Sequence, residues 1–157
     1  MPGPPRLAPF GLVLHRDGRW THEGAPILNR KLRAAFDRGV RYLPEEGVYV
    51  VQLGRFRGQI ELEEAGFFVT GFDAAGGCVR LSDRSEEPLE VASLRPSSHD
   101  GALLCTVKRG LVPDGLPARF FQAAQAELLA AVEDTAEGPA VLMAGRPHPL
   151  PACVAAG

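Results

Sequence analysis

The alternation of apolar and polar positions predicts short β-strands through residues 12–107. Between residues 60 and 63, for example, Ile60 and Leu62 alternate with Glu61 and Glu63, as in a strand with one buried face. Glycine and proline separate the runs, so we expect a meander of roughly seven strands. The apolar runs cover residues 12–15, 20–22, 48–51, 56–62, 66–72, 79–81, 89–94 and 102–107.

A tight hairpin is predicted by Asp17-Gly18, because this pair favours the positive φ angles of a two-residue turn. Such a turn would place His15 opposite Trp20 and Val13 opposite His22. The two histidines would then share one face of the hairpin.

Two helices are predicted by apolar residues at helical spacing. Asn29 can cap the first, which would end at Gly39. The second would begin after Asp114, with Pro117 in its first turn, and run to about residue 133. Its apolar stripe consists of Phe120, Phe121, Ala124, Leu128, Ala131 and Val132.

Strands followed by a helix predict an α+β fold, in which curved antiparallel sheets carry two helices. The order of the elements permits a duplicated core. We divide the chain into a flexible N-terminus (1–9), a subdomain of hairpin, helix and strand (10–64), a subdomain of sheet plus helix (65–146) and a proline-rich tail (147–157). Before the tail, residues 141–143 are expected to form one short strand.

Net charge and aromatic content exclude one class of binding partner. The 157 residues carry a formal net charge of −2, and only 7% are aromatic, which argues against a protein that coats nucleic acid. The charge is nevertheless unevenly distributed: residues 30–57 hold seven basic and three acidic side chains, and residues 58–92 hold two and eight.

Nothing in the sequence predicts a membrane segment, a signal peptide or a bound metal. The opening residues contain no long apolar run, and Cys78, Cys105 and Cys153 form no CxxC pair. We therefore expect a cytoplasmic protein with reduced thiols and no cofactor. His15 and His22 alone would make a poor metal site, because a third ligand is absent.

Familiar catalytic motifs are also absent. The chain has no P-loop, no GxGxxG after a strand, no GxSxG and no HExxH. Glu61, Glu63 and Glu64 could divide acid and base roles, but they also fit the solvated side of a strand. The uneven charge has two interpretations: solvated faces that pair with one another in the fold, or a basic patch of Arg55, Arg57, Lys108 and Arg119 that accepts a small anion.

Several segments resemble an uncharacterised bacterial family, domain of unknown function twelve-eighty-five (DUF1285). The opening Asp17-Gly18-x-Trp20-x-His22-Glu23-Gly24-x-Pro26-Ile27 is similar to that family's N-terminal pattern. Further similar segments are Tyr49-Val50-Val51, Ile60-x-Leu62-Glu63-Glu64-Ala65-x-Phe67 and Val107-Lys108-x-Gly110-Leu111, with Arg119 downstream. The resemblance covers about residues 10–135.

The resemblance implies a duplicated α+β core whose C-terminal half is similar to pleckstrin-homology folds. It also implies a cleft between the halves that takes a nucleotide-like ligand in signalling. The family has no established enzymatic activity.

These observations lead to three hypotheses. The first is a non-enzymatic binding or regulatory domain that takes a small anionic, nucleotide-like ligand between its subdomains, where Trp20, His22 and Glu63 would line the site beside the four basic residues. The second is an interaction scaffold without a small ligand, whose exposed strand edges are compatible with a homodimer. The third is a hydrolase that acts through Glu63, Glu64 and His22.

Overall fold

The computed structural model describes residues 9–155, and the chain forms two compact units. Unit 1 extends to Gly66, and unit 2 begins at Phe67. Each unit is described by itself. Except for Pro9, the expected flexible N-terminus (1–9) lies outside the described residues, as do residues 156–157 of the expected tail.

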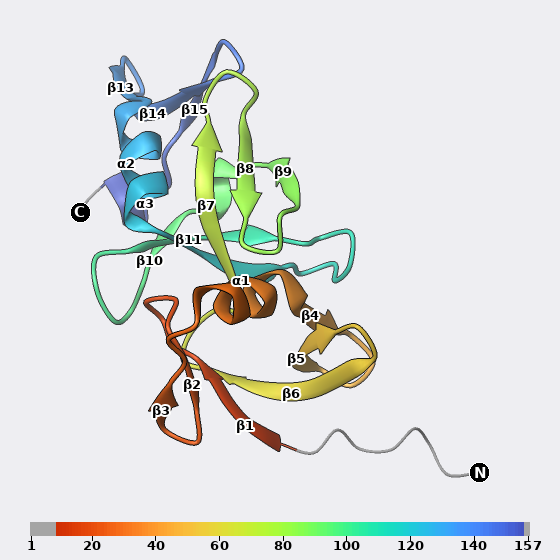
Figure 1. Ribbon diagram of the computed structural model, residues 1–157. Helices are drawn as coiled ribbons and strands as arrows, with labels where there is room; N and C mark the ends of the chain where they lie inside the picture. Colours follow the sequence, from red (N-terminus) through yellow and green to blue (C-terminus); the bar gives the residue numbers. More distant parts are fainter. Residues whose placement is uncertain (1–8, 156–157) are drawn as a thin grey trace. The chain divides into compact units, whose positions relative to one another are not determined.

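Unit 1 is a six-stranded sheet in the order β3-β2-β1-β6-β5-β4, with one helix packed on it (Figure 1). The helix α1 (Arg30–Gly39) joins the first three strands to the last three. The strands are β1 (Pro9–Leu14), β2 (Trp20–His22), β3 (Ala25–Pro26), β4 (Val40–Leu43), β5 (Val48–Leu53) and β6 (Phe56–Leu62).

Unit 2 contains a second six-stranded sheet, in the order β10-β11-β12-β7-β8-β9. A short 3-10 helix, η1 (Val91–Ser93), lies between its first and last three strands, and α2 (Gln122–Ala130) follows them. The strands are β7 (Phe67–Asp73), β8 (Cys78–Leu81), β9 (Glu86–Pro88), β10 (Arg95–Pro96), β11 (Leu103–Val107) and β12 (Leu116–Phe120). An antiparallel sheet of β13 (Val132–Thr135), β14 (Gly138–Met143) and β15 (Arg146–Pro149), then α3 (Ala152–Ala155), completes unit 2.

The two six-stranded sheets have the same connectivity, which confirms the α+β fold and its duplicated core. In each, three strands run outward from the centre and three run back inward, so the first and last strands become central neighbours. These neighbours, β1 with β6 and β7 with β12, are parallel, whereas every other pair is antiparallel. The expected antiparallel sheets are therefore mixed at their centres. The reason is that β4 runs in the same direction as β3, and β10 in the same direction as β9, so the last strand of each sheet runs in the direction of the first.

Each unit buries its own apolar core. In unit 1, Trp20 is 1% exposed, and its ring lies 5.3 Å from that of Phe36 on α1. In unit 2, the apolar face of α2 packs against β7 through Ala124 and Leu128. None of the described helices is long and apolar enough to cross a membrane.

The Asp17-Gly18 hairpin forms, but its register differs from the expected one. Leu14 pairs with Trp20 and Leu12 with His22. The backbone N–H of His15 then donates to Arg19 O at 2.8 Å, so the loop between these two residues holds three residues, 16–18, instead of two. Gly18 has a φ of 89°, the left-handed conformation that ends such a loop. Shifting the pairing by one residue turns His15 and His22 to opposite faces, because successive side chains alternate.

The second helix is shorter than its apolar stripe predicted. Residues 116–120 form β12, in which Leu116, Ala118 and Phe120 are buried at every second position. The apolar residues of this segment alternate with a period of two, as in a strand, but some of them also fit the spacing of a helix. The helix itself begins only at Gln122.

Residues expected to be a loose proline-rich tail partly belong to a sheet. Pro147 and Pro149 lie in β15, at the edge of the three-stranded sheet. An edge strand tolerates proline, since its outward side donates no ladder hydrogen bonds. Prolines at alternate positions place both missing N–H groups on the same side of the strand.

Candidate functional site

The predicted site residues divide between the units, and their environments differ. Trp20, His22, Arg55, Arg57 and Glu63 belong to unit 1, whereas Lys108 and Arg119 belong to unit 2. Exposure and hydrogen-bond partners show which side chains are already engaged within the protein.

Trp20 is part of the core of unit 1. Its indole Nε1 donates a hydrogen bond to Asp37 Oδ1 at 2.8 Å. Burial raises the pKa of Asp37, although the Trp20 hydrogen bond and the nearby Arg33 charge lower it in part. The hydrogen bond from Trp20 therefore holds α1 against the hairpin. It also holds the Asp37 carboxyl group, whose pKa is raised, near Arg33.

Glu63 lies directly after β6 and is bound by the hairpin loop. His15 Nδ1 lies 2.9 Å from Glu63 Oε2, and Arg16 Nη1 donates to Oε1 at 2.6 Å. The hydrogen bond with His15 is the largest influence and, with Arg16, holds the pKa of Glu63 below its usual range. His22 is exposed at the end of β2 and faces away from this cluster.

Arg55 and Arg57 flank the exposed Phe56 at the turn between β5 and β6. Gly54, with a φ of 58°, begins this two-residue turn. Within the described part of the chain, neither arginine side chain forms an ion pair or hydrogen bond. Their charges remain available to a partner in solvent.

Lys108 and Arg119 are bound within unit 2 instead. Lys108 Nζ donates to Asp83 Oδ2 at 2.6 Å and to Ser85 Oγ at 2.9 Å. Arg119 is 8% exposed, and its Nη2 donates to Asp100 Oδ2 at 2.6 Å. Carboxylates of the protein thus compensate both of these cations.

A hollow beside α1 combines two other arginines, which the sequence interpretation did not select. Its volume is about 340 Å³, and its lining consists of Gly18, Arg30, Arg33, Ala34 and Asp37. Arg33 Nε is buried without a hydrogen-bond acceptor, and the Arg30 side chain has no ion-pair partner among the described residues. A buried guanidinium N–H without an acceptor is costly. Because Arg30 and Arg33 both line this hollow, their guanidinium groups can together bind the oxygens of an anion.

Two signals in the sequence point to this hollow in retrospect. Arg30 and Arg33 are three residues apart in a helix capped by Asn29, whose side chain accepts from Leu32 N at 3.0 Å. Residues at this spacing share a helix face. The excess of basic residues between 30 and 57 therefore pointed to an anion site, but the sequence interpretation selected Arg55 and Arg57 rather than the arginines of α1.

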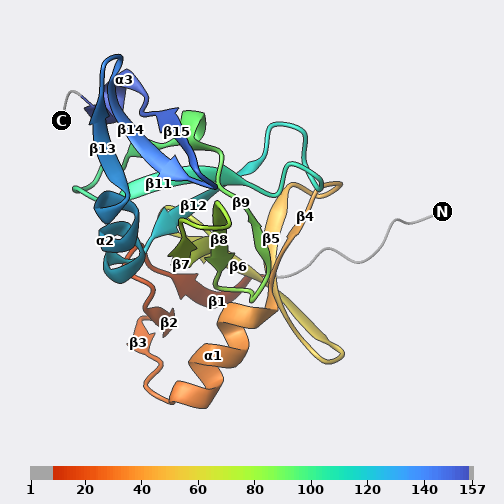
Figure 2. The ribbon, with the colours of Figure 1, turned by 90° about the horizontal axis from the view of Figure 1, so that it is seen from above.

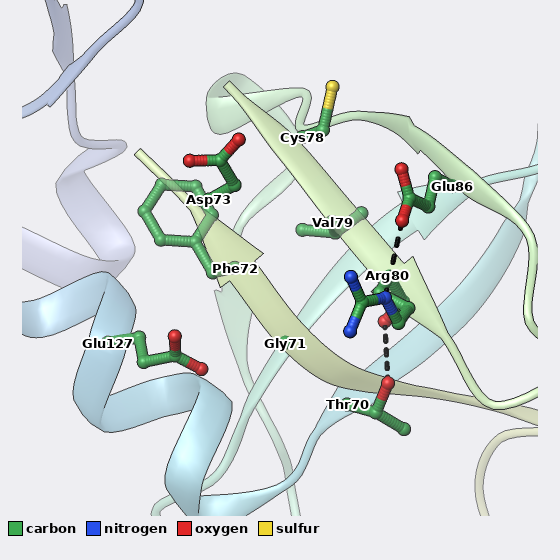
Figure 3. A pocket seen from close by; sticks show the side chains of 9 residues that line it. All are labelled: Thr70, Gly71, Phe72, Asp73, Cys78, Val79, Arg80, Glu86 and Glu127. Carbon is green, nitrogen blue, oxygen red and sulfur yellow. Dashed lines mark hydrogen bonds and ion pairs between the residues drawn. The ribbon is translucent and has the colours of Figure 1, made fainter. Parts of the chain in front are cut away.

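A second hollow, of about 470 Å³, lies on unit 2 along β7 and β8 and is predominantly acidic (Figure 3). Asp73, Glu86 and Glu127 line it, and the one arginine, Arg80, donates to Glu86 at 3.2 Å. Such a lining repels anions. No cluster of three or more histidine, cysteine or acidic side chains able to hold a metal occurs among residues 9–155.

Comparison with known proteins supports the fold. No protein-family model and no curated protein matches the chain. Two solved structures do match, and both are DUF1285 family proteins. The one from Silicibacter pomeroyi DSS-3 has a TM-score of 0.62 and 17% sequence identity, and the match covers 90% of this chain and 80% of that one. The one from Shewanella baltica OS155 has a TM-score of 0.52 and 14% sequence identity, and the match covers 76% of this chain and 91% of that one. The resemblance predicted from the motifs is thus confirmed, and the chain has the fold of DUF1285 family proteins.

Proposed function

We propose that this protein is a divergent DUF1285 member that binds a small anionic, nucleotide-like ligand, and that it acts as a regulatory domain without catalysing a reaction on that ligand. The observation that carries the proposal is that Arg30 and Arg33 line the same hollow beside α1, where the guanidinium group of Arg33 has one N–H, at Nε, without an acceptor. Two guanidinium groups at one hollow match the donor pattern that phosphate oxygens require.

The size of the hollow supports the same ligand class. A volume of about 340 Å³ accommodates a phosphate or diphosphate group, with the remainder of a nucleotide extending into solvent. Asp37 is the one acidic residue in the lining. Its hydrogen bond from Trp20 offsets part of the repulsion that its carboxylate exerts on an anion.

The test is thermal unfolding of the full chain with pyrophosphate, ATP and GTP at millimolar concentrations and constant ionic strength. Because a ligand that binds only the folded state raises its stability by mass action, we expect a higher melting temperature with at least one of them. Arg33→Gln should remove the increase. Asp37→Asn should enlarge it, since a neutral amide can accept the Trp20 hydrogen bond without repelling an anion.

Arg38→Gln is the matched control, because it removes the same charge from another side of α1. This variant should retain the wild-type increase in melting temperature. If Arg33→Gln and Arg38→Gln reduced the increase in melting temperature equally, the anions would be acting on the general charge of α1 and not at the hollow. The absence of any increase with all three anions would refute the proposal.

A further inference from the structure

Three side chains of unit 1 form a hydrogen-bonded series from carboxylate to imidazole to hydroxyl. Glu63 Oε2 lies 2.9 Å from His15 Nδ1, and His15 Nε2 lies 2.8 Å from Thr21 Oγ1. Thr21 lies in β2, whereas His15 directly follows β1 and Glu63 directly follows β6; these three strands are adjacent in the sheet. Three neighbouring strands therefore fix the relative positions of these groups.

The same atoms connect the members of serine hydrolase triads, which are identified by geometry rather than by sequence order; here a threonine hydroxyl takes the place of the serine hydroxyl. Glu63, whose pKa is lowered mainly by its His15 hydrogen bond, stays ionised and accepts the proton on Nδ1. In the neutral imidazole, Nε2 then carries the lone pair and accepts the Thr21 hydroxyl proton. This arrangement prepares the hydroxyl oxygen for attack on an electrophile.

Solvent reaches this series. The side chains of His15 and Glu63 are 26% and 30% exposed, and Thr21 is half-buried. Arg16 Nη1 holds the other oxygen of Glu63 at 2.6 Å, so the carboxylate cannot rotate away from the imidazole. The hydroxyl is thus oriented by the imidazole, in a series whose residues are all partly exposed.

We propose that Thr21 is an activated nucleophile, with His15 as its general base and Glu63 as the residue that positions His15, and that it reacts with small carboxylic esters. Thr21 Oγ1 forms a bond to the carbonyl carbon while its proton passes to His15 Nε2. The bond from that carbon to the alcohol oxygen then breaks, and the alcohol leaves with the proton from His15. Water then gives a proton to His15 Nε2 as its oxygen bonds to the acyl carbon. The bond from that carbon to Thr21 Oγ1 breaks, Oγ1 regains the proton from His15, and the carboxylic acid leaves.

This activity does not depend on the anion hollow, because it uses none of the arginines on α1. It shares Glu63 with the hydrolase hypothesis drawn from the sequence, which combined that residue with Glu64 and His22. The structure positions His15, not His22, against Glu63.

The experiment uses p-nitrophenyl acetate as the probe and the full chain as the protein. Nitrophenolate release is followed by absorbance, and peptide mass spectrometry locates the acetyl group after rapid acid quenching. We expect acetylation at Thr21, and at least a ten-fold lower rate in Thr21→Val and His15→Gln, consistent with the usual contribution of general base catalysis. Thr21→Ser should restore the acetylation at position 21.

Two further variants separate catalysis from structure. Glu63→Gln should lower kcat with little change in KM, because it alters the imidazole tautomer and not the substrate contact. Thr70→Val removes a strand hydroxyl that donates to Arg80 O in unit 2, so its rate should equal that of the wild type. Trp20 fluorescence verifies that each variant is folded. Acetylation confined to lysine, or an unchanged rate in folded His15→Gln, would overturn the proposal.

Discussion

The ammonium group of Lys108 has three neighbours within unit 2. It donates to Asp83 and Ser85, and it lies 5.1 Å from the centre of the Phe67 ring. Lys108 also has a φ of 60°, a left-handed conformation that costs energy for a residue other than glycine. The side-chain contacts compensate this strain, which indicates a structural role for a residue that the sequence suggested for binding.

Asp83 should make the stability of unit 2 sensitive to acid. Burial raises its pKa, but hydrogen bonds from Lys108 and Ser85 outweigh that effect, so the pKa is lowered from 3.8. A lowered folded-state pKa stabilises the protein above the unfolded value, and this contribution is lost as the pH falls through the folded value. We expect the melting temperature of the wild type to decline below about pH 4 more steeply than that of Asp83→Asn.

The stability of Asp83→Asn relative to the wild type at neutral pH measures the contribution of this ion pair. Asp83→Asn leaves the partly buried Lys108 without its ionic partner, so it should cost about 2 kcal/mol at pH 7, less than a fully buried pair would. Calorimetry between pH 3 and 7 measures both effects. Parallel pH profiles for the two proteins would contradict this assignment.

The docking of α1 depends on Gly39, its last residue. A Cβ atom there would lie 2.5 Å from the backbone oxygen of Gln52 on β5, so only glycine allows this close approach. The sequence suggested Gly39 merely as a helix terminator. The approach to β5 is a tertiary contact, which local spacing does not reveal.

Gly39→Ala should therefore lower the free energy of unfolding by about 1–3 kcal/mol, the usual cost of overpacking. Gly110→Ala is the matched control, since a Cβ at Gly110 meets no atom within 4 Å. Urea denaturation followed by Trp20 fluorescence compares the two variants. Similar midpoints for Gly39→Ala and the wild type would show that β5 can shift at no cost.

Much of the fold could be predicted from local patterns, and the errors have physical causes. The alternation of Ile60 and Leu62 with acidic residues correctly indicated β6, and Asn29 correctly indicated the start of α1. The hairpin register was wrong because Asp17-Gly18 fits both a two-residue and a three-residue loop. Pairing partners, not the turn residues, decide between these loops.

The candidate site was less predictable than the fold. Counting basic residues identified a charged segment, but charge alone does not show which cations are already paired. Lys108 and Arg119 contact acidic residues 25 and 19 positions away in the sequence. Such distant partners become apparent only when strands from different parts of the chain are placed side by side.

At the scale of the whole molecule, the core of each unit contains a side chain that can be used to follow the unfolding of that unit. Trp20, the single tryptophan, lies in the core of unit 1, and Cys105, which is 0% exposed, lies in that of unit 2. Burial raises the pKa of the Cys105 thiol to about 12, which suppresses its reaction with thiol reagents in the folded protein. The stabilities of the two units can therefore be followed separately in the intact chain.

Gly115→Ala should accelerate the labelling of Cys105. Gly115 has a φ of 72°, and a Cβ there would lie 3.0 Å from the Val107 backbone oxygen, so the substitution strains the connection between β11 and β12. We expect labelling by a thiol reagent, with the modified cysteine assigned by mass spectrometry, to be at least ten-fold faster than in the wild type, because a loss of about 1.4 kcal/mol or more populates open states. Unchanged protection of Cys105 would contradict this prediction.

The repeated connectivity also has a consequence for synthesis on the ribosome. Since the central pair of each sheet joins its first and last strands, neither sheet can be completed until its sixth strand has emerged. For unit 1 this sixth strand is β6, which ends at Leu62, and for unit 2 it is β12, which ends at Phe120. Figure 2 shows β6 beside β1 and β12 beside β7. Until then β1, and later β7, would expose an unpaired edge in the nascent chain, where a chaperone could bind or a neighbouring polypeptide could aggregate.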